Sequence, residues 1–256
     1  MAGAAAPASP DTGAAEPLLA VRGLTKRFGG LVAVGDCGFE VLRGSVVGII
    51  GPNGSGKSTL FNLVIGLLTP DAGEVSYAGR RIDQMRLHEI ARLGIGRTYQ
   101  AIRIFRDLPV WMNLEIAAMG RRREGWEAAG RDWLERFGLT RLIDAPADSL
   151  SIGQQRLLEL AMNLVVRPDF LMLDEPLAGV NPVIRDMIAE TIGELRAEGY
   201  TFLVIEHHMA FIMRICDRIV VMDHGVKIAE GAPGRIREDP RVLEALLGQT
   251  ARAVPS

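Results

Sequence analysis

The segment from residue 46 to residue 68 constrains the fold most. It begins with VVGII at 46–50, a continuous apolar run typical of a strand buried on both faces. GPNGSGKST at 51–59 matches Gly-x-x-x-x-Gly-Lys-Ser/Thr, and the helical pattern TLFNLVIGLL overlaps its end. In this motif glycines let backbone amides surround a phosphate, Lys57 reaches the β- and γ-phosphates, and the Ser58 hydroxyl ligates magnesium. A plain glycine-rich turn is the alternative, but the flanking strand and helix supply the context that a phosphate loop requires.

The rest of the chain is typical of an α/β protein with a helical insertion. Short alternating runs over 18–47 predict antiparallel strands, and EVSYAG with RRID predicts a further hairpin over 74–83. The block 86–165 is mostly helical in pattern, and strands then alternate with helices, which predicts a parallel sheet with helices on both faces. The expected helices are 87–95, 110–119, 126–138, 154–166, 182–199 and 209–216, and the later strands are 170–174, 201–206 and 218–223, with a last hairpin across His224-Gly225.

Composition bounds the class of protein. The chain has 256 residues, of which 48% are hydrophobic, enough for one large domain or a core with a subdomain. A net charge of −2 argues against nucleic acid as the main partner, because binding a phosphate backbone requires a basic face. The two cysteines, Cys37 and Cys216, have no metal-site spacing and are expected to be reduced thiols of a cytosolic protein.

The chain has no apolar run near the roughly 20 residues of a membrane span. Its start, MAGAAAPASPDTGAAEP, is rich in Ala, Pro and Gly and lacks the features of a signal peptide, so we expect 1–17 to be a disordered tail. The expected protein is soluble and not exported. The one strong basic run, Arg121-Arg122-Arg123, is interpreted as a solvated helix end, with contact to acidic lipids as the alternative.

A pair of acids follows the apolar strand FLMLD at 170–174. A buried strand that ends in Asp174-Glu175 must place both charges where something offsets them. Asp174 suits a magnesium ion, and Glu175, pointing elsewhere, can polarise an attacking water as general base. Two acids in an exposed turn before Pro176 are the alternative, which the phosphate loop in the same chain disfavours.

Two polar residues at the ends of other segments are further candidates. Gln100 lies in GIGRTYQ, where an amide can ligate magnesium and meet the attacking water, although alone it would be taken for a surface residue. His207 follows the strand TFLVIE as Asp174 follows FLML, and an imidazole there could contact a γ-phosphate. A structural histidine is the alternative for His207, and His208 beside it competes for the role.

LSIGQQ at 150–155 has two interpretations. Ser151 and Gln154 have the spacing of a capping box that begins a helix. The unpaired amides at such a helix start also bind anions, so the segment could hold a phosphate as well.

With these motifs in this order, the chain resembles the ATP-binding subunits of ABC transporters. LSIGQQ looks like that family's signature, usually written Leu-Ser-Gly-Gly-Gln. The segments LTKRFGGLVAV, GIGRTYQAIRIFRDLPVWMNL, LDEPLAGVNP and IEHHM are further similar to the ATPases of branched-chain amino acid importers, a group that also handles urea, amides and other small polar molecules. The resemblance runs from Leu18 to the C-terminal region.

The resemblance implies a P-loop NTPase (RecA-like) α/β core with a parallel sheet, an antiparallel β subdomain and an inserted α-helical subdomain. The expected parts of one ABC ATPase domain over 18–250 are 18–97 (β subdomain and P-loop core), 98–165 (helical subdomain with the signature), 166–235 (core with the acids and the histidine) and 236–256 (C-terminal helix and tail).

The resemblance also assigns residue roles. Phe28 stacks on adenine, although KRFGG also suits a strand end with a buried Phe. The ATP-binding residues are Phe28, Gly51, Asn53, Gly54, Ser55, Gly56, Lys57, Ser58 and Thr59; the magnesium ligands are Ser58, Gln100 and Asp174; the catalytic residues are Glu175, His207 and Gln100; and the signature residues that act on a partner's ATP are Ser151, Ile152, Gly153 and Gln154.

The expected cofactors are ATP and Mg²⁺, held in a head-to-tail dimer in which each signature closes over the other chain's ATP. The partners are membrane permease subunits, a second copy or a paralogous ATPase, and indirectly an extracytoplasmic solute-binding protein, with no nucleic acid. The chain would lie on the cytoplasmic face of the inner membrane, and residues 101–119 would form a docking groove for the permease or simply pack in the helical core. Alternatives are an ATPase of the lipopolysaccharide-export type, a soluble non-transport ABC protein and a nucleotide-binding regulator.

Three positions depart from the family pattern. Ile152 replaces the usual first glycine of the signature, but its backbone amide remains. Asn181 stands where many relatives have Asp, which puts the contact across the dimer in doubt. His208 replaces a usual Asp after the histidine and puts no chemistry in doubt.

Overall fold

The computed structural model describes residues 16–120 and 124–247. The expected tail, apart from Glu16 and Pro17, and the run Arg121–Arg123 lie outside the described residues. The strands are β1 (Leu19–Phe28), β2 (Leu31–Val41), β3 (Val46–Ile50), β4 (Ala72–Tyr77), β5 (Arg80–Arg81), β6 (Ile95–Arg97), β7 (Phe170–Asp174), β8 (Thr201–Ile205), β9 (Arg218–Asp223) and β10 (Val226–Gly231). The helices are α1 (Lys57–Val64), α2 (Leu87–Arg92), α3 (Val110–Met119), α4 (Trp126–Arg136), α5 (Ile152–Leu164), α6 (Pro182–Ala197), α7 (Met209–Ile215), α8 (Pro233–Glu238) and α9 (Pro240–Leu247).

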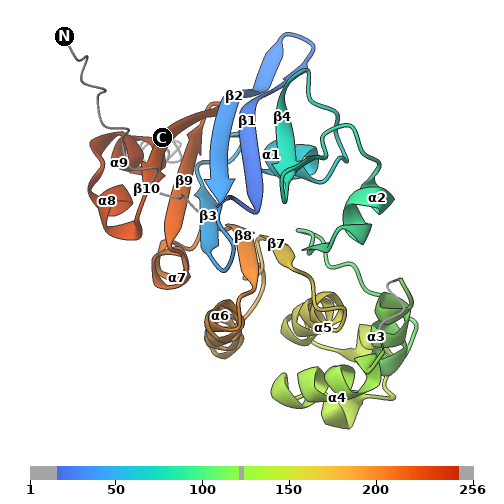
Figure 1. The fold of residues 1–256 in the computed structure, drawn as a ribbon. Coiled ribbons are helices and arrows are strands. Elements are labelled where there is room, and N and C mark those ends of the chain that lie inside the picture. Colours follow the sequence, from blue (N-terminus) through green and yellow to red (C-terminus); the bar gives the residue numbers. More distant parts are fainter. Residues whose placement is uncertain (1–15, 121–123, 248–256) are drawn as a thin grey trace, which may run out of the picture.

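These strands form two sheets. The core sheet has the order β10-β9-β3-β8-β7-β6, parallel except where β10 pairs antiparallel with β9. The second sheet, β2-β1-β4-β5, is antiparallel throughout and lies at the top of Figure 1. The α/β fold with a parallel sheet and an antiparallel sheet, expected from the sequence, is therefore confirmed.

Alternating side chains of the core strands pack against different layers. On β3, Val47 and Ile49 join the cluster that contains α1 and the antiparallel sheet. Val46 and Ile50 join the cluster that contains α3, α5, α6 and α7. Because side chains alternate between the two faces of a strand, each strand must be apolar throughout, which explains the continuous run VVGII.

The helical block lies to one side of the core. Helices α3 and α4 occupy the lower right of Figure 1, with α5 between them and the core elements. Buried leucines such as Leu114 on α3, Leu134 on α4 and Leu157 on α5 belong to one cluster with residues of β7 and α6. The helical block thus shares one hydrophobic cluster with the core and is not a separate unit joined to it by a linker alone.

The structure corrects several expected helix boundaries. Residues 87–95 were expected to form one helix, but α2 ends at Arg92, Gly94 adopts φ +103°, and Ile95 begins β6 beside Phe170. The helical pattern after the phosphate loop was expected to begin at Thr59, but α1 begins at Lys57. Helix α9 lies within the part 236–256 where a C-terminal helix was expected, and α8 precedes it as a separate helix, because Pro240 cannot continue α8 and begins α9.

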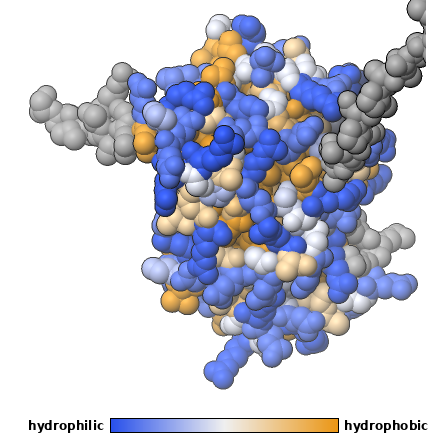
Figure 2. Space-filling view, turned by 60° about the vertical axis from the view of Figure 1, so that its left-hand side comes forward, coloured by the Kyte–Doolittle hydropathy of each residue, from blue (hydrophilic) through white to orange (hydrophobic). Residues whose placement is uncertain are grey.

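Helices long and apolar enough to cross a membrane are absent from the part of the chain that the structure describes. On the face drawn in Figure 2, apolar side chains form separate patches between hydrophilic ones.

Candidate nucleotide site

Loops at the carboxyl ends of the core strands meet around one open cavity of about 490 Å³. The register places the ends of β3, β7 and β8 next to one another, so the segments that follow them converge. The lining residues are Phe28, Leu31, Val32, Ala33, Asn53, Gly54, Gly56, Lys57, Ser58, Thr59, Gln100, Glu175, His207 and His224. Most of the residues expected at the nucleotide from the sequence are therefore brought together here.

The phosphate loop has a backbone that only glycine can adopt at two points. Gly51 has φ +151°, and a Cβ there would lie 2.0 Å from the Met222 carbonyl oxygen. Gly56 has φ +97°, and a Cβ there would lie 2.2 Å from the Ala33 carbonyl oxygen. The loop thus packs between β2 and the end of β9. The backbones of these strands lie so close to Gly51 and Gly56 that no side chain would fit at either position.

Lys57 begins α1 and is buried. Its Nζ donates hydrogen bonds to the carbonyl oxygens of Gly51 at 2.9 Å and Pro52 at 2.7 Å. Burial lowers the pKa of Lys57, and the nearby carboxylates of Glu175 and Asp174 oppose that shift. The ammonium group therefore closes the loop from inside and contributes positive charge to the cavity.

Glu175 is at the centre of a hydrogen-bonded set on the cavity wall. Its Oε1 lies 2.8 Å from His207 Nε2, and its Oε2 accepts from Gln100 Nε2 at 3.2 Å. The backbone of Glu175 is left-handed, with φ +49°, a conformation that costs a non-glycine residue about 1–3 kcal/mol and clusters at active sites. Glu175 thus contacts both of the other residues expected to be catalytic, Gln100 and His207, and the histidine that it contacts is His207 rather than His208.

Asp174 is buried, outside the lining of this cavity. Arg97 of β6 donates to Asp174 Oδ2 at 3.0 Å and to Asn62 Oδ1 of α1 at 2.8 Å. Burial raises the pKa of Asp174, and the Arg97 guanidinium opposes the shift. Arg97 therefore links strand β7, which ends in Asp174, to the phosphate-loop helix α1, and this link was not predicted from the sequence.

The donor set expected for magnesium has the chemistry that this ion prefers. A hydroxyl from Ser58, an amide oxygen from Gln100 and a carboxylate from Asp174 are hard oxygen ligands, and Mg²⁺ sites in proteins commonly complete their shell with waters and phosphates. Groups of three or more His, Cys, Asp or Glu side chains placed to hold a metal are not found among residues 16–120 and 124–247. Ser58 and Gln100, which line the cavity, therefore fit an ion shared with phosphates, whereas Asp174 lies outside the lining and is paired with Arg97.

Phe28 ends β1 and is 48% exposed on the cavity wall. The alternative interpretation of KRFGG, a strand end with a buried Phe, is right about the strand end but wrong about burial, because the Phe28 side chain is exposed. An exposed ring beside a phosphate loop is available for stacking on a flat base.

Ser151 to Gln154 form the capping box expected from the sequence. The backbone N–H of Gln154 donates to the Ser151 Oγ at 3.3 Å, and the backbone N–H of Ser151 donates to the Gln154 Oε1 at 3.0 Å. Ile152 is 58% exposed, and Gly153 lies against Ile184 of α6, where a Cβ would be 2.3 Å from the Ile184 Cδ1. These residues are not part of the lining of the chain's own cavity, so they are not brought together with its phosphate loop.

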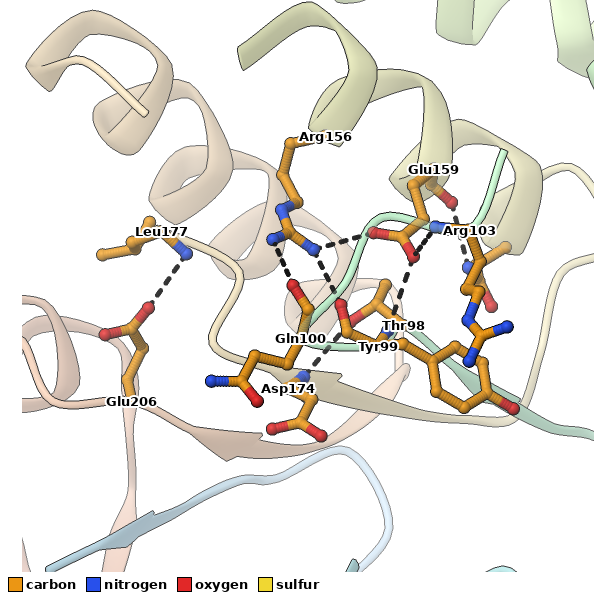
Figure 3. A network of polar contacts seen from close by, with 10 residues as sticks. Thr98, Tyr99, Gln100, Arg103, Arg156, Glu159, Asp174, Leu177 and Glu206 are labelled. Atoms are coloured by element: carbon orange, nitrogen blue, oxygen red, sulfur yellow. Dashed lines mark hydrogen bonds and ion pairs between the residues drawn. The ribbon is translucent and has the colours of Figure 1, made fainter. Parts of the chain in front are cut away.

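A buried ion pair on α5 holds the segment that carries Gln100. Arg156 donates to the carbonyl oxygens of Tyr99 at 2.8 Å and Gln100 at 2.9 Å, and to Glu159 at 2.9 Å. Glu159 accepts from the amides of Tyr99 at 3.4 Å and Arg103 at 3.0 Å. Figure 3 shows both side chains reaching down from α5 to this segment. The pair was not predicted from the sequence, although two opposite charges at i, i+3 within an apolar helical run were a signal.

Asn181 and His208 begin helices. The Asn181 side chain accepts from the Ile184 amide at 3.0 Å and caps α6. His208 Nδ1 accepts from the Phe211 amide at 3.3 Å at the start of α7, and its Nε2 lies 2.6 Å from Arg185 Nη1. Both departures from the family pattern therefore have local structural roles.

Residues 101–119 divide between the two interpretations offered for them. Val110 and Leu114 are buried in the core, as simple packing requires. Phe105, Met112 and Met119 are exposed large apolar side chains, as a docking surface requires.

Comparison with known proteins identifies the family. Residues 34–178 match the model of the ABC transporter family. The chain belongs to the ABC transporter ATP-binding family. The matched region contains the phosphate loop, Gln100, the signature and Glu175, while His207 lies beyond it.

Relatives agree over nearly the whole chain. The chain is 41% identical over 252 residues to the high-affinity branched-chain amino acid transport ATP-binding protein LivG of Salmonella typhimurium, covering 91% of this chain and 99% of that protein. It is 41% identical over 252 residues to BraF of Pseudomonas aeruginosa, of the same description, covering 91% of this chain and 98% of that protein.

A solved structure described as the ADP conformation of an ATP-binding cassette of an ABC transporter matches with a TM-score of 0.83 and 33% identity, covering 91% of this chain and 99% of that one. The fold is therefore that of a P-loop ABC ATPase, as the sequence predicted.

Proposed function

We propose that this chain is the ATP-hydrolysing subunit of an ABC importer for branched-chain amino acids or similar small polar solutes. The observation that carries the proposal is the contact of Glu175 with both His207 and Gln100 on the wall of the phosphate-loop cavity. Identity of 41% to LivG supports the solute class.

The site suggests a division of labour during hydrolysis. ATP lies with its adenine on Phe28 and its phosphates against the amides of the loop and Lys57. Ser58, Gln100 and Asp174 would hold magnesium, which would supply positive charge that offsets the phosphates. Glu175 accepts the proton of the attacking water, and His207 donates to a γ-phosphate oxygen.

The signature supports a head-to-tail dimer. Helix α5 begins at Ile152 with an exposed start, yet this end does not reach the chain's own cavity. Amides at a helix start bind anions, so the ligand is the ATP of a second copy or of a paralogous ATPase. ATP then joins the two chains, and loss of the γ-phosphate lets them separate.

Membrane permease subunits are the proposed partners, with an extracytoplasmic solute-binding protein acting through them. A second cleft of about 490 Å³ lies between α2, β6, α3 and α5. Its wall includes Arg97, which contacts Asp174. The side chains of Arg97 and Asp174 would therefore connect an element docked there to the nucleotide site. The chain would be peripheral on the cytoplasmic face of the membrane.

The test is reconstitution. The chain, co-purified with the permease subunits of its transporter and placed in lipid vesicles, should hydrolyse ATP faster when leucine and the cognate binding protein are supplied. Stimulation by a lipopolysaccharide in place of an amino acid would support the export-type alternative. ATPase activity unaffected by the permeases would refute the transport function.

A further inference from the structure

Glu206 is a buried carboxylate that accepts hydrogen bonds from three backbone amides. It follows β8 directly and is 4% exposed. Its Oε1 accepts from the amide of Leu177 at 2.9 Å, while its Oε2 accepts from the amides of His207 at 2.8 Å and His208 at 3.1 Å. Figure 3 shows the Leu177 amide directed at this carboxylate. Hydrogen bonds to an ionised acceptor are about twice as strong as neutral ones, so this is a firm tether.

The tether lies where the backbone ladder between β7 and β8 stops. The last paired residues are Asp174 and Ile205, and the Glu175 amide still donates to the Ile205 carbonyl oxygen at 2.9 Å. Beyond this point the two loops diverge from strand geometry. The Glu206 side chain supplies the next cross-link, with one oxygen for each loop.

We propose that Glu206 is a positioning residue for ATP hydrolysis, which holds the loop of Glu175 and the loop of His207 at a fixed separation. The separation that matters is the 2.8 Å between His207 Nε2 and Glu175 Oε1. Leu177 is two residues after Glu175, and His207 is adjacent to Glu206, so a shift of the carboxylate displaces both partners relative to each other. This inference rests on the hydrolysis of ATP at the proposed site.

A glutamine at this position separates charge from shape. Glutamine has one acceptor oxygen and one NH₂ group in place of two acceptor oxygens. Its oxygen can face Leu177 or the two histidine amides, and the NH₂ then opposes an N–H donor on the other side. Glu206→Gln should therefore release one loop while leaving the phosphate loop untouched.

The experiment compares full-length wild type, Glu206→Gln and the exposed control Glu198→Gln, which makes the same change of charge at the end of α6. ATP affinity is measured with a fluorescent analogue and hydrolysis by phosphate release. For Glu206→Gln we expect kcat to fall about 10-fold or more, equivalent to about 1.4 kcal/mol, with ATP affinity within about 2-fold of wild type. Glu198→Gln should match wild type.

A double-mutant cycle separates positioning from general damage. In a His207→Ala background the tether has no imidazole to place, so adding Glu206→Gln should lower kcat by less than about 2-fold further. Equal fold-losses in both backgrounds, or wild-type kcat in Glu206→Gln, overturn the proposal. If Glu206→Gln does not fold, Glu206→Asp, which keeps the charge on a shorter side chain, is put through the same cycle with the same two deciding outcomes. A wild type that binds but does not hydrolyse ATP would instead defeat the proposed function.

Discussion

Removing Arg156 should loosen the helical block from the nucleotide site. Arg156→Met takes away the guanidinium that bonds the carbonyl oxygens of Tyr99 and Gln100 and leaves Glu159, 2% exposed, without its cation. Burial already raises the pKa of Glu159, so the uncompensated carboxylate is costly at neutral pH. Breaking a buried ion pair on one side typically costs about 3–5 kcal/mol.

The loss can be expressed as a shift in urea concentration. The carbonyl oxygens of Tyr99 and Gln100 are only partly buried, so water can replace their lost donors, and we take about 4 kcal/mol, the middle of the range for a broken buried pair. With a slope near 3 kcal/mol per molar, the unfolding midpoint falls by about 1.3 M. Because the pKa of Glu159 is raised in the folded state, that state binds the proton more readily, and the deficit should shrink as pH falls from 7.5 towards 5.5.

The chain carries its own probe for this measurement. Its three tryptophans, Trp111, Trp126 and Trp133, all lie in α3 and α4, so their fluorescence reports on the helical block, whereas far-UV circular dichroism reports on the whole fold. In Arg156→Met the fluorescence transition should precede the dichroism transition. The double variant Arg156→Met/Glu159→Leu should be no less stable than the worse single variant.

Two results would refute this reasoning. A fluorescence midpoint within about 0.3 M of wild type would mean that the pair contributes little, as an exposed ion pair does. Additive losses in the double variant would mean that the two side chains act independently.

Three further predictions concern the chemistry. Glu175→Gln should keep ATP binding, reduce hydrolysis by about 100-fold or more and run as an ATP-bound dimer on size exclusion. Hydrolysis at the wild-type rate in this variant would show that Glu175 is not the general base. Gly153→Ala, whose new Cβ meets Ile184, should leave ATP binding by the isolated chain unchanged and lower hydrolysis about 10-fold, whereas an equal loss of binding would show that the signature acts within its own chain. Burial lowers the pKa of Lys57, so ATP affinity should fall as pH rises through that lowered value and the cation is lost; affinity that stays constant up to about pH 10.4, where an exposed lysine titrates, would contradict this.

Residues that act through a continuous motif were predictable from the sequence. The phosphate loop and the acidic pair each follow an apolar strand, and parallel strands bring such ends to one edge of the sheet. The structure brings Lys57 and Glu175 to the wall of one cavity, as this reasoning predicts. The choice of His207 over His208 needed the family resemblance, because the two histidines are adjacent in the sequence. They differ only in what their side chains contact, Glu175 for His207 and Arg185 for His208.

Residues that act through backbone groups far along the chain were not predictable in this way. Arg156 bonds carbonyl oxygens 56 and 57 residues earlier, and no pattern in the sequence marks those oxygens. Glu206 follows β8 directly just as Glu175 follows β7, and this parallel was the available signal. The strand β6 was missed because its three residues follow a short helix after Gly94, too few to show a period of two.

The left-handed backbone of Glu175 has a consequence for laboratory evolution. Glycine adopts positive φ without strain, so Glu175→Gly would relieve about 1–3 kcal/mol of local cost. A library of this chain sorted only for heat resistance would therefore enrich glycine at position 175 and discard the residue that removes a proton from water. Screens that aim to preserve turnover need a selection for hydrolysis at every round, because folding stability and catalysis favour different residues at this one position.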